Sequence, residues 1–232
     1  MRMKRGTLSG TIDWRYAIGE VVLIVVGILI ALAASEWQTG RAERRTELAL
    51  LEELHTGLAA DLTSARDLLD RYRSIAAEIE PLLEHMRAGE DYSDALALQF
   101  GAAYGYRPLD FNRAAYESIK SQGLDLISRA ELRSAIAHLY EQAIPLAEGA
   151  VAVERNVILE LLRPYYLARF RNLRFNESAE PLDYELLLAD TEFLNVLDYR
   201  LQVLRQNHIR QFEGLIPEIE TVLRELEVEL AG

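Results

Sequence analysis

Histidine and carboxylate side chains are the groups in this chain that could hold a metal ion or move a proton. The chain has four histidines and no cysteine, which excludes disulfides, thiol catalysis and thiolate metal sites. One histidine follows a carboxylate at helical spacing, in the pair Glu52 and His55. A di-metal site in a helical bundle needs two such pairs and two further glutamates. His85, His138 and His208 lack that spacing, so we predict neither a metal site nor another cofactor.

Two of the histidines, His55 and His208, fall on core-facing positions of amphipathic helices. We interpret them as core histidines that are hydrogen-bonded to a neighbour, with a metal ligand or a pH switch as the alternative. The sequence contains no nucleophile constellation, no phosphate-cradling glycine loop and no His-Glu-x-x-His segment. We therefore assign no catalytic residues and expect no enzymatic activity.

A segment that interleaves arginine with aromatic residues stands out in an otherwise acidic region. Its candidate site residues are Arg163, Tyr165, Tyr166, Arg169, Arg171 and Arg174. Guanidinium groups beside aromatic rings suit an anionic ligand or a protein partner. The alternative is that the arginines complement a helix end and pair with nearby acids, while the rings join the core.

A second candidate is a set of polar residues around a predicted turn. It comprises Arg107, Asp110, Asn112 and Lys120. These residues could line a pocket, or they could satisfy backbone groups at the ends of the adjoining helices.

Residues 16–37 form the one hydrophobic segment long enough to cross a bilayer. As a helix it would be roughly 33 Å long, which matches the hydrocarbon core. Trp14, Tyr16 and Trp37 stand at its two ends, where aromatic rings prefer to lie. We expect a retained transmembrane helix. The alternative is a signal peptide that is cleaved after residues 31–33.

Three residues of this segment are candidates for contacts within the membrane, namely Glu20, Gly27 and Ala31. A carboxylate in hydrocarbon is costly, so Glu20 either contacts a partner helix or extends to the headgroups. Gly27 and Ala31 are small residues four apart, a spacing that lets two helices approach closely. We therefore expect a homo-oligomer or a membrane protein partner, in addition to the lipid bilayer.

The charge distribution along the chain indicates which partners the protein could bind and how the chain is oriented in the membrane. The net charge is −12, and the first 37 residues carry +1, which leaves −13 for the remainder. Such an acidic domain should not bind nucleic acid. Four basic residues precede the apolar segment and three follow it closely, which favours a cytoplasmic N-terminus in a bacterial inner membrane. We expect the C-terminal domain to lie outside the cytoplasm, in the periplasm if there is an outer membrane.

Apolar residues from Leu48 to Met86 recur at spacings of three and four, which predicts a long amphipathic helix with a kink or restart near Pro81. Further helices are expected over residues 93–104, 112–122, 128–170, 184–188 and 190–230. The 128–170 helix should start with a capping box and bend at Pro145, Gly149 and Pro164, and the last helix should bend at Pro217. Residues 172–183 are expected to be a loop, and no strand is expected.

These elements predict an all-α fold, with an N-terminal transmembrane helix that continues into an elongated antiparallel helical bundle. The bundle should have about four helical layers, the second built from two pieces. We divide the chain into a basic N-terminal segment (1–15), the transmembrane helix (16–37) and a helical bundle domain (38–232).

Two stretches carry a resemblance to known proteins. The first is Tyr16-Ala17-Ile18-Gly19-Glu20, followed by Gly27-Ile28-Leu29-Ile30-Ala31-Leu32 and Trp37; the second is residues 116–123, followed by Leu126-Ile127-Ser128 and Leu132. Together they resemble an uncharacterised bacterial family of single-pass membrane proteins. The family's tryptophan usually follows asparagines, whereas Ala34-Ser35-Glu36 precede it here. The resemblance implies a membrane anchor and a single soluble region, and it implies no catalytic activity.

Two functions remain open on these grounds. The first is a membrane-anchored helical scaffold or protein-interaction module. The second is an extracytoplasmic sensory bundle that binds a small ligand, such as an anion, and signals through a partner chain.

Overall fold

The structure is a computed structural model that describes residues 14–232, with the side chains of Glu20 and of residues 22–232. Residues 1–13 of the predicted basic segment and the rings of Trp14 and Tyr16 lie outside this description. The chain divides into two compact units, Met1–Leu48 and Ala49–Gly232. The fold is all-α apart from one short hairpin, which confirms the predicted class.

The helix α1 (Trp14–Ala88) begins in the first unit. Its apolar side chains in that unit, such as Leu23, Leu29 and Ile30, are 75%, 59% and 64% exposed. Among the described residues, α1 is the helix that is long and apolar enough to cross a membrane.

In the second unit, α1 continues through Pro81 without a break and ends at Ala88. The predicted end of this helix is confirmed, but no new helix starts at Pro81. Proline removes one backbone hydrogen bond, and here the burial of Ile79, Leu82 and Leu83 keeps the surrounding turns helical. Gly89 then adopts a φ of +66°, a left-handed conformation that commonly terminates a helix.

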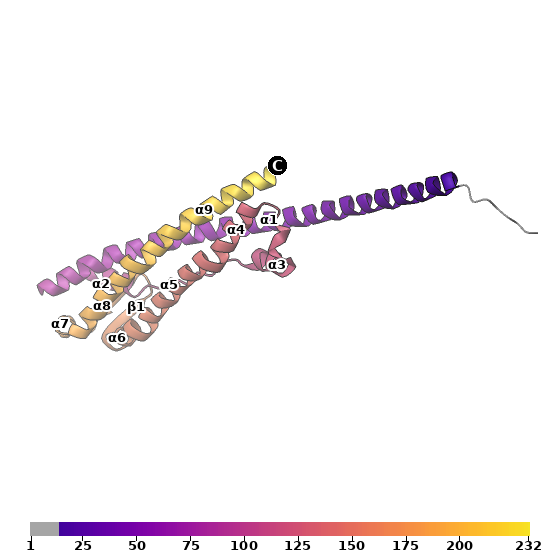
Figure 1. The fold of residues 1–232 in the computed structure, drawn as a ribbon. Helices are drawn as coiled ribbons and strands as arrows, with labels where there is room; N and C mark the ends of the chain where they lie inside the picture. Colours follow the sequence, from indigo (N-terminus) through magenta and orange to yellow (C-terminus); the bar gives the residue numbers. More distant parts are fainter. Residues whose placement is uncertain (1–13) are drawn as a thin grey trace, which may run out of the picture. The chain divides into compact units, whose positions relative to one another are not determined.

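Within residues 49–232, three long helical rods make the bundle (Figure 1). The first is the later part of α1. The second runs through α4 (Ala130–His138), η2 (Leu139–Ala143), α5 (Ile144–Asn156), η3 (Val157–Leu162) and α6 (Arg163–Arg169). The third runs through α8 (Thr191–Val203), η4 (Leu204–Ile209) and α9 (Arg210–Ala231). The segments η2, η3 and η4 are π-helical turns.

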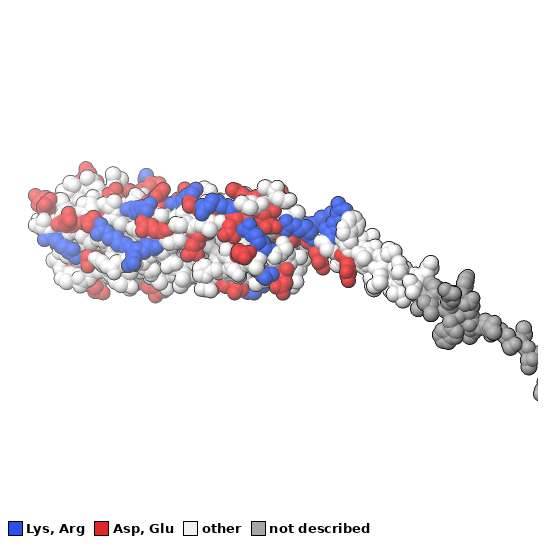
Figure 2. Space-filling view, turned by 45° about the horizontal axis from the view of Figure 1, so that its top comes forward, with Lys and Arg blue, Asp and Glu red and all other residues white. Residues whose placement is uncertain are grey.

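Ion pairs fix the antiparallel register of the first and third rods. The pairs are Arg66–Glu220 at 2.6 Å, Arg73–Glu213 at 2.7 Å, Glu80–Arg205 at 2.5 Å and Arg87–Asp198 at 3.2 Å. The paired residues of α1 are seven positions apart. Their partners on α9, η4 and α8 are seven or eight positions apart and follow in the reverse order, as antiparallel helices require. Figure 2 shows basic and acidic side chains interspersed on the visible face of the second unit.

Shorter elements complete the second unit. They are α2 (Ala95–Ala103), α3 (Ala114–Gln122), the 3₁₀ turn η1 (Leu124–Leu126) and α7 (Tyr184–Leu188). The predicted helices at 93–104, 112–122 and 184–188 are thus confirmed within two residues at each end. Asp190 caps α8 by accepting hydrogen bonds from the backbone N–H groups of Glu192 and Phe193, as its position predicts.

The prediction of a loop over residues 172–183, and of no strand, is wrong. The strands β1 (Phe170–Arg174) and β2 (Ser178–Pro181) form an antiparallel hairpin. Asn176 takes a positive φ of 62° in its turn. The hairpin lies against α2 at Gly101, where a Cβ atom would collide with the backbone of Ser178. Its strands are short and mostly polar, so their sequence lacks the apolar alternation that signals a strand.

The expected features of the second rod also differ in detail. Pro145 and Pro164 are the second residues of α5 and α6, which continue directly from the π turns η2 and η3. Proline has no N–H to donate, and the altered hydrogen bonding of a π turn coincides with each missing donor. The N-cap of α4 is Arg129, one residue after the predicted Ser128.

The core is continuous through the second unit and contains three stacked aromatic rings, Tyr104, Tyr166 and Phe170, and the exposed ring of Phe175 extends the stack. The ring centroids are 5.0 Å apart for Phe175–Tyr104, 4.3 Å for Tyr104–Tyr166 and 4.4 Å for Tyr166–Phe170. This stack joins α2, α6 and the hairpin, and it lies beside the buried charged residues described next.

Candidate functional site

A cluster of charged side chains is buried between the second and third rods. Glu154 on α5 is 1% exposed, while Arg200 on α8 and His208 on η4 are fully buried. Nη2 of Arg200 lies 2.6 Å from Oε1 of Glu154, and Nε2 of His208 lies 3.3 Å from Oε2. Burial of charged groups costs desolvation free energy, so other contacts within the protein must compensate for it.

Arg200 makes those contacts with the chain that follows α2. Its Nη1 donates to the carbonyl of Ala103, and its Nη2 donates to the carbonyl of Gly105 at 2.6 Å. These carbonyls lie at the C-terminal end of α2, where helical backbone acceptors lack partners. Arg200 therefore ties the end of α2 to the second and third rods.

The ionisation of Glu154 follows from this environment. Burial raises the pKa of its carboxyl, but attraction to Arg200 and the contact with His208 outweigh burial, so that its pKa is lowered overall. Glu154 is thus a buried carboxylate that is charged at neutral pH.

Several polar atoms of the cluster have no hydrogen-bond partner among the described residues. They are the Tyr72 hydroxyl, Nε of Arg200, both ring nitrogens of His208 and Oε2 of Glu154; His208 Nε2 and Glu154 Oε2 lie 3.3 Å apart without hydrogen-bond geometry. The ring centroids of Tyr72 and His208 are 5.1 Å apart, so Tyr72 brings α1 to the same place. Buried polar groups normally find partners, and a concentration of unpartnered ones favours a functional interpretation over a purely structural one.

The arginine and aromatic residues of 163–174 are not gathered into one surface. Tyr166 is fully buried and donates to the carbonyl of Phe100 at 2.8 Å. Arg169 pairs with Asp190 at 2.6 Å, and its guanidinium lies 5.8 Å from the ring centroid of Tyr165.

The remaining arginines of that segment also lie apart. Arg171 pairs with Glu180 at 3.1 Å across the hairpin, and Arg174 pairs with Glu177 at 3.9 Å. Arg163 is exposed at the start of α6. This arrangement matches the structural alternative, in which the arginines pair with local acids and the rings join the core.

The polar residues around the α3 turn separate into two groups. The backbone N–H of Asn112 donates to Asp61 at 2.9 Å, and its side chain accepts from the N–H of Ala114 at 3.1 Å. Lys120 pairs with Glu141 at 2.8 Å. Arg107 and Asp110 are exposed beside Tyr106 and stay outside this hydrogen-bonded corner.

The three candidate membrane-contact residues lie on α1 in the first unit. Glu20, Gly27 and Ala31 are exposed, and a Cβ atom at Gly27 would meet nothing within 4 Å. His55 lies 3.6 Å from Glu227 of α9. Among the described residues, no group of three or more histidines and carboxylates is placed to hold a metal ion.

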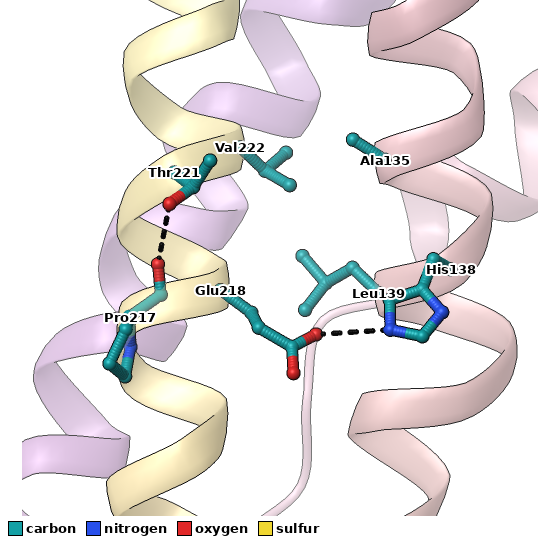
Figure 3. Close-up of a pocket in the computed structure, with 7 residues that line it drawn as sticks. All are labelled: Ala135, His138, Leu139, Pro217, Glu218, Thr221 and Val222. Carbon is teal, nitrogen blue, oxygen red and sulfur yellow. Dashed lines mark hydrogen bonds and ion pairs between the residues drawn. The ribbon is translucent and has the colours of Figure 1, made fainter.

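A shallow pocket of about 330 Å³ opens between the second and third rods (Figure 3). Leu139, Pro217 and Val222 give it apolar walls, and His138 and Glu218 face each other across it at 3.4 Å. Figure 3 shows both side chains pointing toward the space between the helices. The pocket is separate from the buried cluster.

The sequence interpretation placed His208 in the core beside a hydrogen-bonding neighbour, and it missed Glu154 and Arg200. A signal for both was present. Glu154 continues the apolar line through Ala147 and Val151, and Arg200 adjoins the apolar positions Leu197 and Leu201. One charged residue of each sign on the core faces of two antiparallel helices indicates a buried pair.

The fold and this site define a helical-bundle protein in which α1, among the described residues, is apolar and long enough to cross a membrane. The chain belongs to DUF6090, a family of unknown function, whose model matches residues 20–145. The matched region contains Tyr72 and the end of α2, while Glu154, Arg200 and His208 follow it. No curated protein and no solved structure matches the chain.

Proposed function

We propose that this protein is a membrane-anchored helical module that acts by binding other proteins, and that it catalyses no reaction itself. The observation that supports the proposal is the exposed apolar surface of α1 in the first unit, where Val22, Ile24 and Ile28 are 54%, 54% and 55% exposed. A run of such side chains is unfavourable in water and favourable in lipid.

In this proposal the N-terminus lies in the cytoplasm of a bacterial inner membrane and the second unit on the extracytoplasmic side; the basic residues before the run favour this orientation. Glu20 lies near the cytoplasmic end of the run, within reach of the headgroups.

The partner side of the proposal rests on Gly27 and Ala31. Both are exposed, they are one helical turn apart, and neither side chain extends beyond a methyl group, so a second transmembrane helix can pack closely there. We propose a second copy of the chain, or another single-span protein, as that helix. The −13 charge after residue 37 disfavours nucleic acid as a partner.

The absence of cysteine makes the proposal directly testable. Single-cysteine variants Gly27→Cys and Leu29→Cys are compared in membranes under mild oxidation. We expect a disulfide-linked dimer with Gly27→Cys and much less with Leu29→Cys, because Leu29 projects from the opposite side of the helix. Equal crosslinking of the two variants contradicts a second copy as the partner, and recovery of the protein in the aqueous fraction after an alkaline wash contradicts the membrane anchor.

Topology is tested with a third variant, Ser74→Cys, at an exposed position of α1 in the second unit. A membrane-impermeant maleimide should label it from outside intact spheroplasts. Labelling only after lysis would place the second unit in the cytoplasm.

A further inference from the structure

The pocket between the second and third rods combines apolar walls with one carboxylate. Leu139, Pro217 and Val222 form the walls, and among the seven residues that line the pocket Glu218 is the one acid. Its volume of about 330 Å³ lies at the lower end of the range for small-molecule sites, about 300–1,000 Å³. An apolar lining with few polar groups is typical of such sites, so the pocket fits a small ligand.

One oxygen of Glu218 is buried at this pocket without a hydrogen-bond partner among the described residues. The side chain as a whole is 43% exposed, but its Oε2 is covered and lies 3.4 Å from Nε2 of His138, without hydrogen-bond geometry. Figure 3 shows the carboxylate and the imidazole pointing into the space between the helices. A buried acceptor without a donor is unfavourable, so this oxygen favours a ligand that donates a hydrogen bond.

Glu218 also differs from its neighbours on α9 in its charge pairing. Glu213 and Glu220 each pair with an arginine of α1, at 2.7 Å and 2.6 Å. Among the described residues, no lysine or arginine lies within the 4.0 Å ion-pair limit of Glu218. Its negative charge is therefore available to a ligand.

The surrounding charge favours a cation over an anion. The chain carries −12 and its first 37 residues +1, so residues 38–232 carry −13, and Glu218 places one of these charges at the pocket. Arg210 lines the adjoining hollow, which shares His138 and Glu218 with the pocket, but it does not line the pocket itself. A cation that donates hydrogen bonds meets both requirements of this carboxylate.

We propose that this pocket binds a small primary amine with an apolar body, such as an aromatic or alkyl amine. The ammonium group donates to Oε2 of Glu218, and a neutral imidazole at His138 accepts a second hydrogen bond. The apolar body packs against Leu139, Pro217 and Val222. This site goes beyond the proposed membrane function and does not depend on it, because its residues all lie in the second unit.

The test is thermal unfolding of the full-length protein in detergent with benzylamine as the probe, against sodium chloride at matched ionic strength. A probe of about eight non-hydrogen atoms should bind with a Kd on the order of 1 mM. Benzylamine at about ten times that Kd should raise the Tm by about 3–6 °C. Benzyl alcohol has the same shape without the charge, and at the same concentration it should raise the Tm by at most about 1–2 °C.

The role of the carboxylate is tested with Glu218→Gln, which keeps the size of a half-exposed side chain and removes its charge. This variant should weaken benzylamine binding about tenfold, to the level of benzyl alcohol. Glu227→Gln is the matched control, since Glu227 also lies on α9 beside a histidine, His55 at 3.6 Å, and does not line the pocket. It should leave the shift unchanged. All proteins are measured in the same detergent, so uptake of the probe by micelles is equal.

The role of the space itself is tested with Ala135→Leu. Figure 3 shows Ala135 at the edge of the pocket, where a leucine should fill the space and abolish the shifts from both probes. Three results overturn the proposal: no shift with benzylamine, equal shifts with benzylamine and benzyl alcohol, or a benzylamine shift that Glu218→Gln and Glu227→Gln reduce equally.

Discussion

Glu154 and Arg200 form an ion pair of 2.6 Å in which neither side chain is more than 1% exposed to solvent. They belong to different rods, and Arg200 also binds the end of α2. The pair therefore connects three parts of the second unit. Its removal should lower the stability of the whole unit and not only change the packing around the two residues.

The first prediction concerns the stability of this pair. Replacement of Arg200 by Met leaves the Glu154 carboxylate buried without its main partner, which should lower the free energy of unfolding by about 3–5 kcal/mol. The double variant Glu154→Leu/Arg200→Met should recover part of that loss, because no unpaired charge remains. Urea unfolding followed by circular dichroism measures both.

The control for this prediction is Arg205→Gln, which breaks the exposed pair with Glu80. An exposed pair contributes at most about 1 kcal/mol, so this variant should unfold almost like the wild type. Equal losses for Arg200→Met and Arg205→Gln would contradict the assignment of Arg200 as a central stabilising residue.

The second prediction concerns pH. The pKa of Glu154 is lowered in the folded protein, whereas an unfolded glutamate titrates near about 4.3. The stabilisation from its charged form is therefore complete above about pH 4.3 and is lost as the pH falls through the folded pKa. Arg200 and His208 face this carboxyl, and the ring of Tyr72 lies against that of His208.

We expect the stability difference between the wild type and Glu154→Gln to be largest near neutral pH and to shrink as the pH falls below about 4. Urea midpoints of both proteins at a series of pH values give this difference directly. The stability that both proteins lose as their other carboxylates are protonated is the same and cancels in the difference. A difference that grows in acid would show that Glu154 is protonated in the native state.

The third prediction uses two glycines in helices. A Cβ atom at Gly101 would collide with the backbone of Ser178, whereas one at Gly149 would meet nothing within 4 Å. Gly101→Ala should therefore detach the β1–β2 hairpin from α2 and expose it to limited proteolysis. Gly149→Ala should instead stabilise the protein by up to about 1 kcal/mol, because alanine is the better helix former.

The fourth prediction concerns the apolar run of α1. Val26→Asp introduces a charge near the middle of residues 16–37, at a cost of roughly 3 kcal/mol for insertion. The fraction of protein retained in washed membranes should fall. Thr39→Asp, beyond the apolar run, is the control and should leave retention unchanged.

Much of the fold could be predicted because the spacing of apolar residues along the chain indicates which helix faces are buried. The spacing from Leu48 to Met86 placed the amphipathic part of α1 and its end, and Asp190 marked the start of α8. The hairpin was missed because it packs against α2 at Gly101, 77 residues before Ser178 in the chain, and such contacts leave no local pattern.

The buried charged cluster was harder to predict, because its residues come from different helices. Sequence spacing shows which residues share a helix face, but not which helix faces pack against each other. His208 was placed in the core, while its partner Glu154 lies on another helix.

The π turn at η4 has a consequence for how the chain tolerates insertions and deletions. In an α-helix, residues seven apart share a face; a π turn contains one extra residue, so residues eight apart share one. Arg200 and His208 are separated by eight positions. The π turn η4 begins at Leu204, after Arg200, and includes His208. Insertion of a single residue into the 205–207 stretch would therefore rotate the imidazole away from Glu154, whereas loss of one would leave Arg200 and His208 seven apart in an ordinary helix and still on one face. The match between the eight-residue spacing and the π turn, more than the identity of the exposed side chains there, keeps the Arg200 guanidinium and the His208 imidazole beside one carboxylate.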